Sequence, residues 1–332
     1  MASTKKTKPK VATIGAATQD VFLMGNALKA KRDVRTHEFV EQFPLGAKLE
    51  LDRVVFSTGG GATNAAVTFT RQGFATQFLG KIGDDPAGQS VVKELKAEGI
   101  NTATLICDVS GSTGYSTLLL APRGERTVLV HRGVSQELSA EDFSYFAKLK
   151  ADWLYVTSLA GNFPLLESAI EYAKTHGIKL AINPGSSELK QPERLQKLLH
   201  NFSIVSVNKE ESELLADGKT INSRVRQLAQ QCAVAVITDG AKGSYACDGA
   251  AVYKAGMYED VPVLDRTGAG DAFTSGFVAK VMEGESIEKA LTFGSANSTS
   301  VVQSVGSKTG ILSSDAKLRQ MEIKKTTINT KE

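Results

Sequence analysis

The stretch Asp265-Arg-Thr-Gly-Ala-Gly-Asp271 carries two glycines, ends at an aspartate and runs directly into an apolar segment. Small and apolar residues recur in that segment at helical spacing, which predicts a helix from about residue 270 to 282. The first-turn amides of a helix lack partners inside the helix, and together with the helix dipole they attract anions. A carboxylate beside such a site, Asp271, suits a base for a hydroxyl that attacks a phosphoryl group. A turn followed by an N-capping aspartate would leave the same local pattern.

Length and composition set the broad class of the protein. A chain of 332 residues suffices for one large domain, or for a large domain with a smaller appendage. Its net charge of +3 gives no sign of a nucleic-acid or membrane surface. The three cysteines are far apart and lack metal-ligand spacing, which predicts buried, reduced thiols. Since no signal peptide or membrane-spanning run is visible, we expect a cytoplasmic protein.

From about residue 152 onward, strand-like and helix-like segments alternate. Strands are predicted at 153–156, 179–182, 204–207 and 234–238, with helices near 163–175, 192–201 and 223–231. This alternation predicts a mostly parallel sheet with helices on both faces. An earlier strand at 11–15 leads into Asp20, which is either a ligand contact at the carboxyl end of the sheet or a cap.

Two other regions alternate apolar and polar residues, which predicts a small second sheet. The first covers about 21–56, with candidate strands at 37–43 and 48–56. The second covers about 113–131, with strands at 115–121 and 126–130 joined by a hairpin turn. We expect these regions to pair as a lid on a domain that spans residues 10–320, with flexible tails at 1–9 and 324–332.

Three further motifs admit both a ligand-binding and a structural interpretation. Gly59-Gly-Gly-Ala-Thr-Asn64 opens a helix with three glycines, which permit close approach to a ligand or merely a turn. Asn208 and Glu211 at a strand-to-helix junction suit magnesium and phosphate held through water, but their spacing equally fits a capping box. The glycine-bearing loop Thr238-Asp-Gly-Ala-Lys-Gly243 could cradle a nucleotide, although alone it is a weak signal.

Taken in order, these motifs resemble the ribokinase-like, or PfkB, family of ATP-dependent sugar and nucleoside kinases. The resemblance extends from Val11 to about Ile311. It rests on the motifs at 59–64, 80–88, 208–211, 238–243 and 265–271. It implies a three-layer α/β/α sandwich with a mostly parallel central sheet and a β-sheet lid over the sugar.

The resemblance also implies a role for each matched residue. Asp271 would be the base, and the amides of Gly268, Ala269 and Gly270 would hold the charge on the transferred phosphoryl group. Substrate hydroxyls would be bound at Asp20, Gly60, Gly61 and Asn64, and the nucleotide at Asn208, Thr238, Gly240, Gly243 and Asn297. ATP would be the donor, Glu211 would organise Mg²⁺ through water, and K⁺, which many members bind, would lie near Asp265 and Thr267.

Two departures from the family pattern bear on specificity. Arg266 stands where the family usually has a small residue, which leaves potassium dependence open, and Gly61 replaces a lysine of ribokinases proper, which weakens an assignment to ribose. The leading hypothesis is ATP-dependent phosphorylation of a sugar hydroxymethyl group. The alternatives are a silent sugar or nucleotide sensor and a nucleoside kinase with a base platform among the lid aromatics Phe22, Phe39, Phe43 and Tyr115. A homodimer through the lid is also expected, because pairing would cover exposed strand edges.

Overall fold

The computed structural model describes residues 8–121, 126–142, 149–258 and 260–328. Its body is built on a ten-stranded sheet whose strands, in spatial order, are β16, β15, β14, β13, β12, β11, β10, β1, β6 and β7. In chain order these are β1 (Lys10–Ile14), β6 (Ala75–Gly83), β7 (Asn101–Asp108), β10 (Trp153–Val156), β11 (Lys179–Ile182), β12 (Ile204–Asn208), β13 (Val234–Thr238), β14 (Ser244–Cys247), β15 (Ala251–Ala255) and β16 (Ile323–Thr327). The strands from β7 to β13 run parallel, and β14, β15 and β16 continue the sheet antiparallel.

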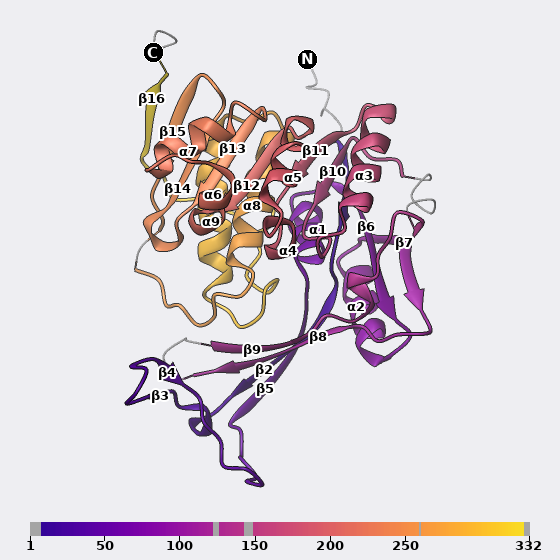
Figure 1. Ribbon diagram of the computed structural model, residues 1–332, viewed down its shortest axis with the longest axis vertical. Coiled ribbons are helices and arrows are strands. Elements are labelled where there is room, and N and C mark those ends of the chain that lie inside the picture. Colours follow the sequence, from indigo (N-terminus) through magenta and orange to yellow (C-terminus); the bar gives the residue numbers. More distant parts are fainter. Residues whose placement is uncertain (1–7, 122–125, 143–148, 259, 329–332) are drawn as a thin grey trace.

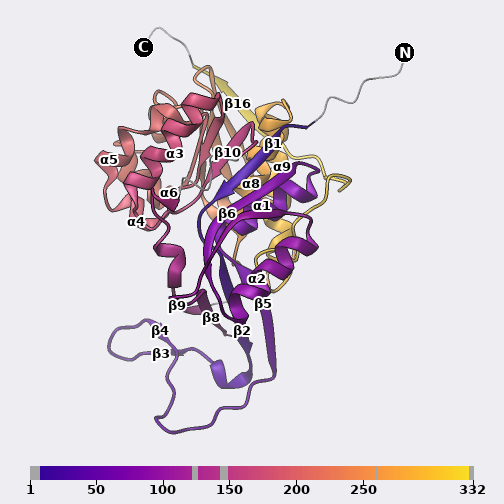
Figure 2. The same ribbon diagram turned by 90° about the vertical axis from the view of Figure 1, so that its right-hand side faces the viewer.

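Helices cover both faces of this sheet, which gives the three layers predicted from the alternating pattern (Figure 2). One face carries α1 (Gly61–Arg71), α2 (Pro86–Ala97), α8 (Ala269–Met282) and α9 (Ile287–Val301). The other carries α3 (Phe163–His176), α4 (Ser186–Leu189), α5 (Pro192–Gln196), α6 (Lys209–Leu215) and α7 (Ile221–Leu228). The apolar run of β1 explains its central place: Ala12 and Ile14 pack toward the α3 side, and Val11 packs toward the α1 side.

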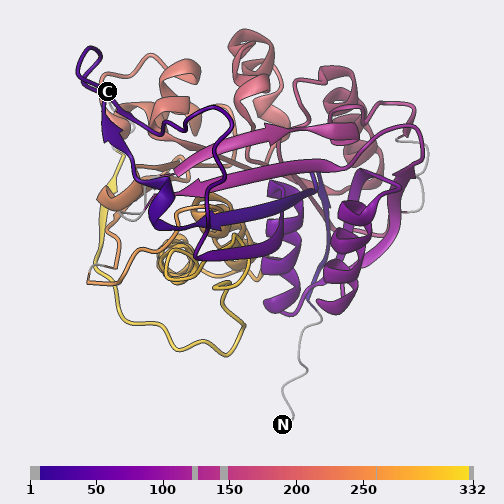
Figure 3. The ribbon, with the colours of Figure 1, turned by 90° about the horizontal axis from the view of Figure 1, so that it is seen from below.

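A separate four-stranded sheet projects from the body and forms the lid (Figure 1). It consists of β2 (Thr18–Met24), β5 (Arg53–Gly59), β8 (Gly114–Leu120) and β9 (Arg126–His131), in the order β5-β2-β8-β9. Figure 3, which views the molecule from below, shows these strands side by side in front of the body. Two short strands, β3 (Lys31–Arg32) and β4 (Phe39–Val40), pair in the long connection between β2 and β5.

The lid differs from the sequence prediction in three places. Of the segment 37–43 only Phe39–Val40 is a strand, and the next lid strand begins at Arg53 instead of residue 48. Asp20 lies within lid strand β2 and not in a loop after β1. The chain leaves β1 of the central sheet and soon enters β2 of the lid. The polar residues 18–20 therefore belong to a lid strand and not to a loop at the edge of the central sheet. The turn predicted at 122–125 lies outside the described residues.

Two other predictions need correction. Residues 323–327 form edge strand β16 instead of a frayed tail, because Ile323 packs on the core and the backbone pairs with β15. The lysines of β16 hid its strand character. Among the cysteines, Cys247 is buried as predicted but Cys107 is exposed. The tail residues 1–7 and 329–332 lie outside the described residues.

Over the described ranges, none of the helices is both long and apolar enough to cross a lipid bilayer.

Candidate active site

The glycine loop before α8 leaves the amides of the helix start open. Gly268 occupies the N-cap in the left-handed region (φ 78°), and none of the described side chains caps the helix. A Cβ at this position would lie 2.5 Å from Cβ of Ser307, so both the conformation and the close packing require glycine. The Ala269 amide donates to the carbonyl of Arg266 at 3.3 Å, whereas the amides of Gly268 and Gly270 have no acceptor among the described residues. These two amides therefore remain available to an anion, with Asp271 in the same turn.

The start of α1 meets the start of α8 at one hydrogen bond. Asn64 Nδ2 donates to Asp271 Oδ2 at 2.7 Å, although the two residues are 207 positions apart. Gly60, at the N-cap of α1, has φ 97° and packs against the carbonyl of Ala16. A Cβ on Gly61 would lie 3.3 Å from Asp271 Oδ1, so this second carboxylate oxygen faces the glycine turn. The sequence motifs at 59–64 and 265–271 thus form one corner.

Asp20 borders the same corner from the lid side. Its carboxylate lies so close to Gly59 that a Cβ there would be 2.0 Å from Asp20 Oδ2. Oδ1 accepts a hydrogen bond from Thr18 Oγ1 at 3.0 Å. Asp20 therefore reaches one end of the glycine turn while Asp271 reaches the other, and a ligand between them would meet two carboxylates.

Burial raises the pKa of both carboxyls above their ordinary value. For Asp271 the hydrogen bond from Asn64 and the charge of Lys308 act against burial without cancelling it. For Asp20, hydrogen bonds from Thr18 and Ser116 and the charge of Lys308 oppose burial in the same way. A carboxyl with a raised pKa is a better proton acceptor than one in water, which suits a general base.

A cavity of about 500 Å³ adjoins the start of α8. Its lining brings together Thr238, Gly240 and Gly243 from one motif with Ala269 and Gly270 from another. Arg266 also lines it, on the exposed side of the loop. The cavity therefore runs from the predicted nucleotide loop to the predicted anion site.

Asn297, which was predicted to contact the nucleotide, does not line this cavity. Its side chain is fully buried. Nδ2 donates to the carbonyl of Ala272, and Oδ1 accepts from the amide of Leu312. Asn297 fixes α9 against α8 and the C-terminal segment, whereas the neighbouring Ser298 and Thr299 border the cavity.

Asn208 and Glu211 form a reciprocal capping box at the start of α6. Asn208 Oδ1 accepts from the amide of Glu211, and Glu211 Oε2 accepts from the amide of Asn208, both at 2.8 Å. Burial raises the pKa of Glu211, with a smaller contribution from the charges of Glu210 and Asp271. Strand β12, which leads into this box, is joined to α8 by a hydrogen bond between Ser206 Oγ and Thr274 Oγ1 at 2.9 Å. The box therefore begins beside α8, so a cap and a ligand role are compatible here.

Asp265 closes its own loop. Oδ1 accepts from the amide and hydroxyl of Thr267, and Oδ2 accepts from the amide of Gly306 at 3.2 Å. Both carboxylate oxygens therefore accept from protein donors and hold the loop closed. Each oxygen has a further lone pair, so potassium binding near Asp265 and Thr267 stays a prediction.

Two residues of the site were missed at the sequence level. Ser307 Oγ donates to Asn64 Oδ1 at 2.9 Å, and Lys308 Nζ donates to Thr58 Oγ1. Both belong to the segment after α9, which also donates the Gly306 amide to Asp265. No local pattern could have revealed them, because their partners lie more than 240 residues away in the sequence.

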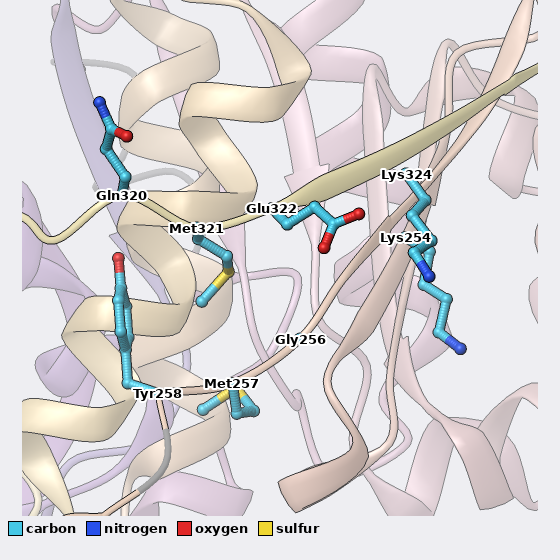
Figure 4. A pocket seen from close by; sticks show the side chains of 8 residues that line it. All are labelled: Lys254, Gly256, Met257, Tyr258, Gln320, Met321, Glu322 and Lys324. Atoms are coloured by element: carbon cyan, nitrogen blue, oxygen red, sulfur yellow. The ribbon is translucent and has the colours of Figure 1, made fainter.

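A second cavity, of about 380 Å³, lies beside β15 and β16 (Figure 4). Lys254 and Lys324, which are register partners on these strands, stand at one end, and Tyr258 stands at the other. It shares Met257 and Tyr258 with the larger cavity but contains none of the predicted site residues.

Comparisons with known proteins agree with this geometry. Residues 21–314 match the model of the pfkB family carbohydrate kinases. The chain is 32% identical to a fructokinase of Vibrio alginolyticus over 67% of this chain and 75% of that protein. It is 28% identical to a ribokinase of Staphylococcus aureus over 80% of this chain and 89% of that protein.

Solved structures share the fold at low sequence identity. A putative ribokinase II from E. coli superimposes with a TM-score of 0.77 at 18% identity, covering 91% of this chain and 96% of that one. A Burkholderia thailandensis nucleoside kinase in complex with inosine gives 0.72 at 16% identity, covering 91% and 94%. The resemblance read from the motif order and the ribokinase-like α/β fold are both confirmed. The chain belongs to the pfkB family of carbohydrate kinases.

Proposed function

We propose that this kinase transfers the γ-phosphoryl group of ATP to a hydroxymethyl group of a sugar, with Asp271 as the general base. The observation that carries the proposal is the contact between Asn64 and Asp271, where two helices without side-chain caps begin. This corner offers a proton acceptor and open amide donors within one small volume. Phosphoryl transfer needs chiefly positioning, charge stabilisation and a nearby base.

The two carboxylate oxygens of Asp271 would have different roles: one is hydrogen-bonded in place and the other accepts the proton. Oδ2 is held by Asn64, and Oδ1 faces the glycine turn and would accept the proton of the sugar hydroxyl. The hydroxyl oxygen forms a bond to the γ-phosphorus while the bond to the β–γ bridging oxygen breaks and ADP leaves. The amides of Gly268, Ala269 and Gly270 would stabilise the charge on the phosphoryl oxygens.

The donor would occupy the 500 Å³ cavity, with Thr238, Gly240 and Gly243 along the nucleotide. Among the described residues no group of three acidic, histidine or cysteine side chains could hold a metal ion alone. That fits Mg²⁺ held mainly by phosphates and water, with Glu211 as the carboxylate behind the water. When bound, the ion would neutralise phosphate charge. Asp265 and Thr267 close their loop through a mutual hydrogen bond, and K⁺ would lie near this pair.

A sugar acceptor is favoured over a nucleoside. The relatives found by sequence similarity bear the names of sugar kinases. Of the aromatic residues considered as a base platform, Phe22 is fully buried in the lid core with Leu118 and cannot stack on a base. Phe39, Phe43 and Tyr115 are exposed, so a nucleoside kinase remains the alternative that the screen below tests. Asp20, Gly60, Gly61 and Asn64 instead surround the corner with groups that bind hydroxyls or admit close approach.

An ADP-release screen tests this proposal. Wild type is assayed with magnesium-ATP against ribose, fructose, 2-keto-3-deoxygluconate and nucleosides, with and without potassium. Turnover on a sugar is expected, together with a loss of about 10²–10⁴-fold in Asp271→Asn. Asp248→Asn is the matched control, because Asp248 caps the remote β14–β15 turn and should leave turnover unchanged. Turnover on nucleosides alone, or full activity in Asp271→Asn, would refute the assignment.

We also propose that two copies pair through the lid. Its outer strand β9 exposes Leu129 (58%) and Val130 (53%), and the other edge strand exposes Phe56 (70%). Paired lids would cover these apolar side chains and the strand edges. Sedimentation analysis should give a dimer for wild type and a monomer for Leu129→Lys, and a monomeric wild type would disprove the pairing.

A further inference from the structure

Lys308 is a buried cation that the proposed transfer chemistry does not yet use. Only 3% of its surface is exposed. Nζ lies 3.3 Å from Glu94 Oε1 of α2 and donates a hydrogen bond to Thr58 Oγ1 of lid strand β5. Burying an ammonium group is costly unless it is paired and hydrogen-bonded. Such a residue at the junction of lid and body therefore suggests a specific task.

The segment around Lys308 is fixed independently of its ammonium group. Arg71 of α1 donates Nη1 to the carbonyls of Lys308 and Ile311, at 3.0 and 2.9 Å. Ser307, the preceding residue, donates to Asn64, which in turn holds Asp271. Changing the side chain of Lys308 therefore leaves the tethers of its backbone in place.

The charges facing this region are mostly negative. Asp20 of β2 and Glu94 and Glu98 of α2 interact with Lys308, and Glu98 is already paired with Arg71. Asp265 acts on Asp20, and Glu211 and the hydroxyl of Tyr155 are electrostatically coupled to Asp271. Lys308 lowers the pKa of both Asp20 and Asp271. Burial lowers the pKa of its own ammonium group, and the charges of Glu94, Asp20 and Glu98 oppose that loss of the proton.

We propose that Lys308 is a positioning residue whose buried ammonium group is the counter-charge that lets Asp20 and Asp271 stand ionised together at the acceptor site. Burial disfavours the ionised form of both carboxyls that border the glycine turn, and the charge of Asp265 adds to this at Asp20. A fixed positive charge behind the turn lowers that cost. The hydrogen bond to Thr58 holds this charge at the base of the lid. The proposal rests on the function proposed above, because it assigns Lys308 to that same site.

The pH profile of kcat/KM tests the proposal. Removing the ammonium group in Lys308→Met or Lys308→Gln should move the acid limb to higher pH by about one unit, the lower end of the range for a nearby opposite charge. The sign follows because the base must be ionised and loses its stabilising cation. The glutamine variant keeps a hydrogen-bond donor for Thr58, so it covers the case in which the methionine variant fails to fold.

Two controls separate charge from structure. Lys280→Met removes a half-buried ammonium group paired with Glu283 at the far end of α8 and should leave the acid limb in place. Thr58→Val removes the hydrogen bond, but the ion pair with Glu94 still holds the ammonium group in place, so this variant also should not move the limb. An unshifted limb in the Lys308 variants would overturn the proposal even if their turnover fell.

A measurement without turnover distinguishes this failure from failure of the proposed function. Aspartate labelled with ¹³C at Cγ reports each carboxyl directly, and the signals of Asp20 and Asp271 are identified by their loss in the Asn variants. Both should titrate at higher pH in Lys308→Gln than in wild type. If wild type phosphorylates no acceptor, this titration still decides the proposal, and unchanged titration midpoints would reject it.

Discussion

The starts of α8 and α6 place amide donors near the same corner but use them in opposite ways. At α6, Asn208 and Glu211 satisfy each other's backbone amides in a capping box. At α8, the N-cap is Gly268, which has no side chain to offer, and no described side chain caps the first turn. Capped amides stabilise the helix, whereas open amides remain available to a ligand.

This difference teaches how the two kinds of motif should be interpreted. A polar cap followed by glutamate is stable without a ligand, so its spacing alone never indicates function. A glycine at the N-cap provides no side-chain acceptor for these amides. A bound anion can take the place of that acceptor. The start of α1, with Gly60 as its cap, follows the α8 pattern, and its Asn64 contacts the α8 carboxylate.

Gly268→Ala should have the largest effect. The new Cβ would need a left-handed conformation, at roughly 1–2 kcal/mol, and would collide with Ser307. We expect kcat/KM to fall about 100-fold, because displacements near 1 Å at a transfer site cost this much. Gly177→Ala is the matched control: it has φ 65° at the end of α3, with open space around its Cβ. It should lose only the stability that the left-handed conformation costs, measured by thermal unfolding, and should keep its activity. An equal kinetic loss in both variants would contradict the open-amide role.

Glu211→Gln should separate the ligand role from the cap. Glutamine can still accept from the amide of Asn208, so the Tm should not fall. The magnesium concentration for half-maximal rate should rise about 10-fold, as for groups that act behind a metal-bound water. Glu210→Gln, on the same turn, removes an equal charge and serves as the control. An unchanged magnesium requirement would leave Glu211 with only its capping role.

Asn208→Ala should have a smaller effect, mainly on stability. Losing an N-cap costs about 1 kcal/mol, and Thr220→Ala at the start of α7 should cost a similar amount. Chemical denaturation measures both losses. Only the Asn208 variant should also raise KM for ATP, because α7 contributes none of the proposed site residues. Parallel KM changes in the two variants would point to general loosening instead.

Asp271→Asn should raise thermal stability slightly at neutral pH. Burial raises the folded-state pKa of Asp271, so its stabilising contribution is present below its ordinary pKa and is lost as pH rises through the raised one. The Tm difference between variant and wild type should therefore be near zero at low pH and positive at neutral pH. Asp85→Asn should show the opposite sign, since hydrogen bonds from Gly88 and Thr113 outweigh burial and lower the pKa of Asp85. A negative difference for Asp271→Asn at neutral pH would contradict this assignment.

Local patterns predicted the layers and the corner well, because their causes are local. The alternation of strand-like and helix-like segments predicted β10 to β13. The glycine motifs at 59–64 and 265–271 predicted the starts of α1 and α8 close to where the structure has them. Asp20 was expected at the sheet edge, and it does border the corner, although it does so from a lid strand.

What the sequence could not show depends on partners far along the chain. Asn297 was predicted to contact the nucleotide from a helix of small residues. Its side-chain amide instead hydrogen-bonds to the backbone of Ala272 and Leu312. Ser307 and Lys308 follow the last long helix as ordinary polar residues, and only the fold brings them to Asn64 and Thr58. The sequence pattern did not predict β16, because its lysines are exposed and break the apolar alternation. It is a strand because its backbone pairs with β15.

The position of Ser307 has a consequence for synthesis of the chain. The ribosome makes β1, Asn64 and most of the sheet early, and N-terminal parts begin to fold while synthesis continues. The donor that orients the Asn64 amide toward Asp271 comes only at residue 307. During synthesis the transfer corner can therefore be completed only after residue 307 has been added, when the chain is nearly finished.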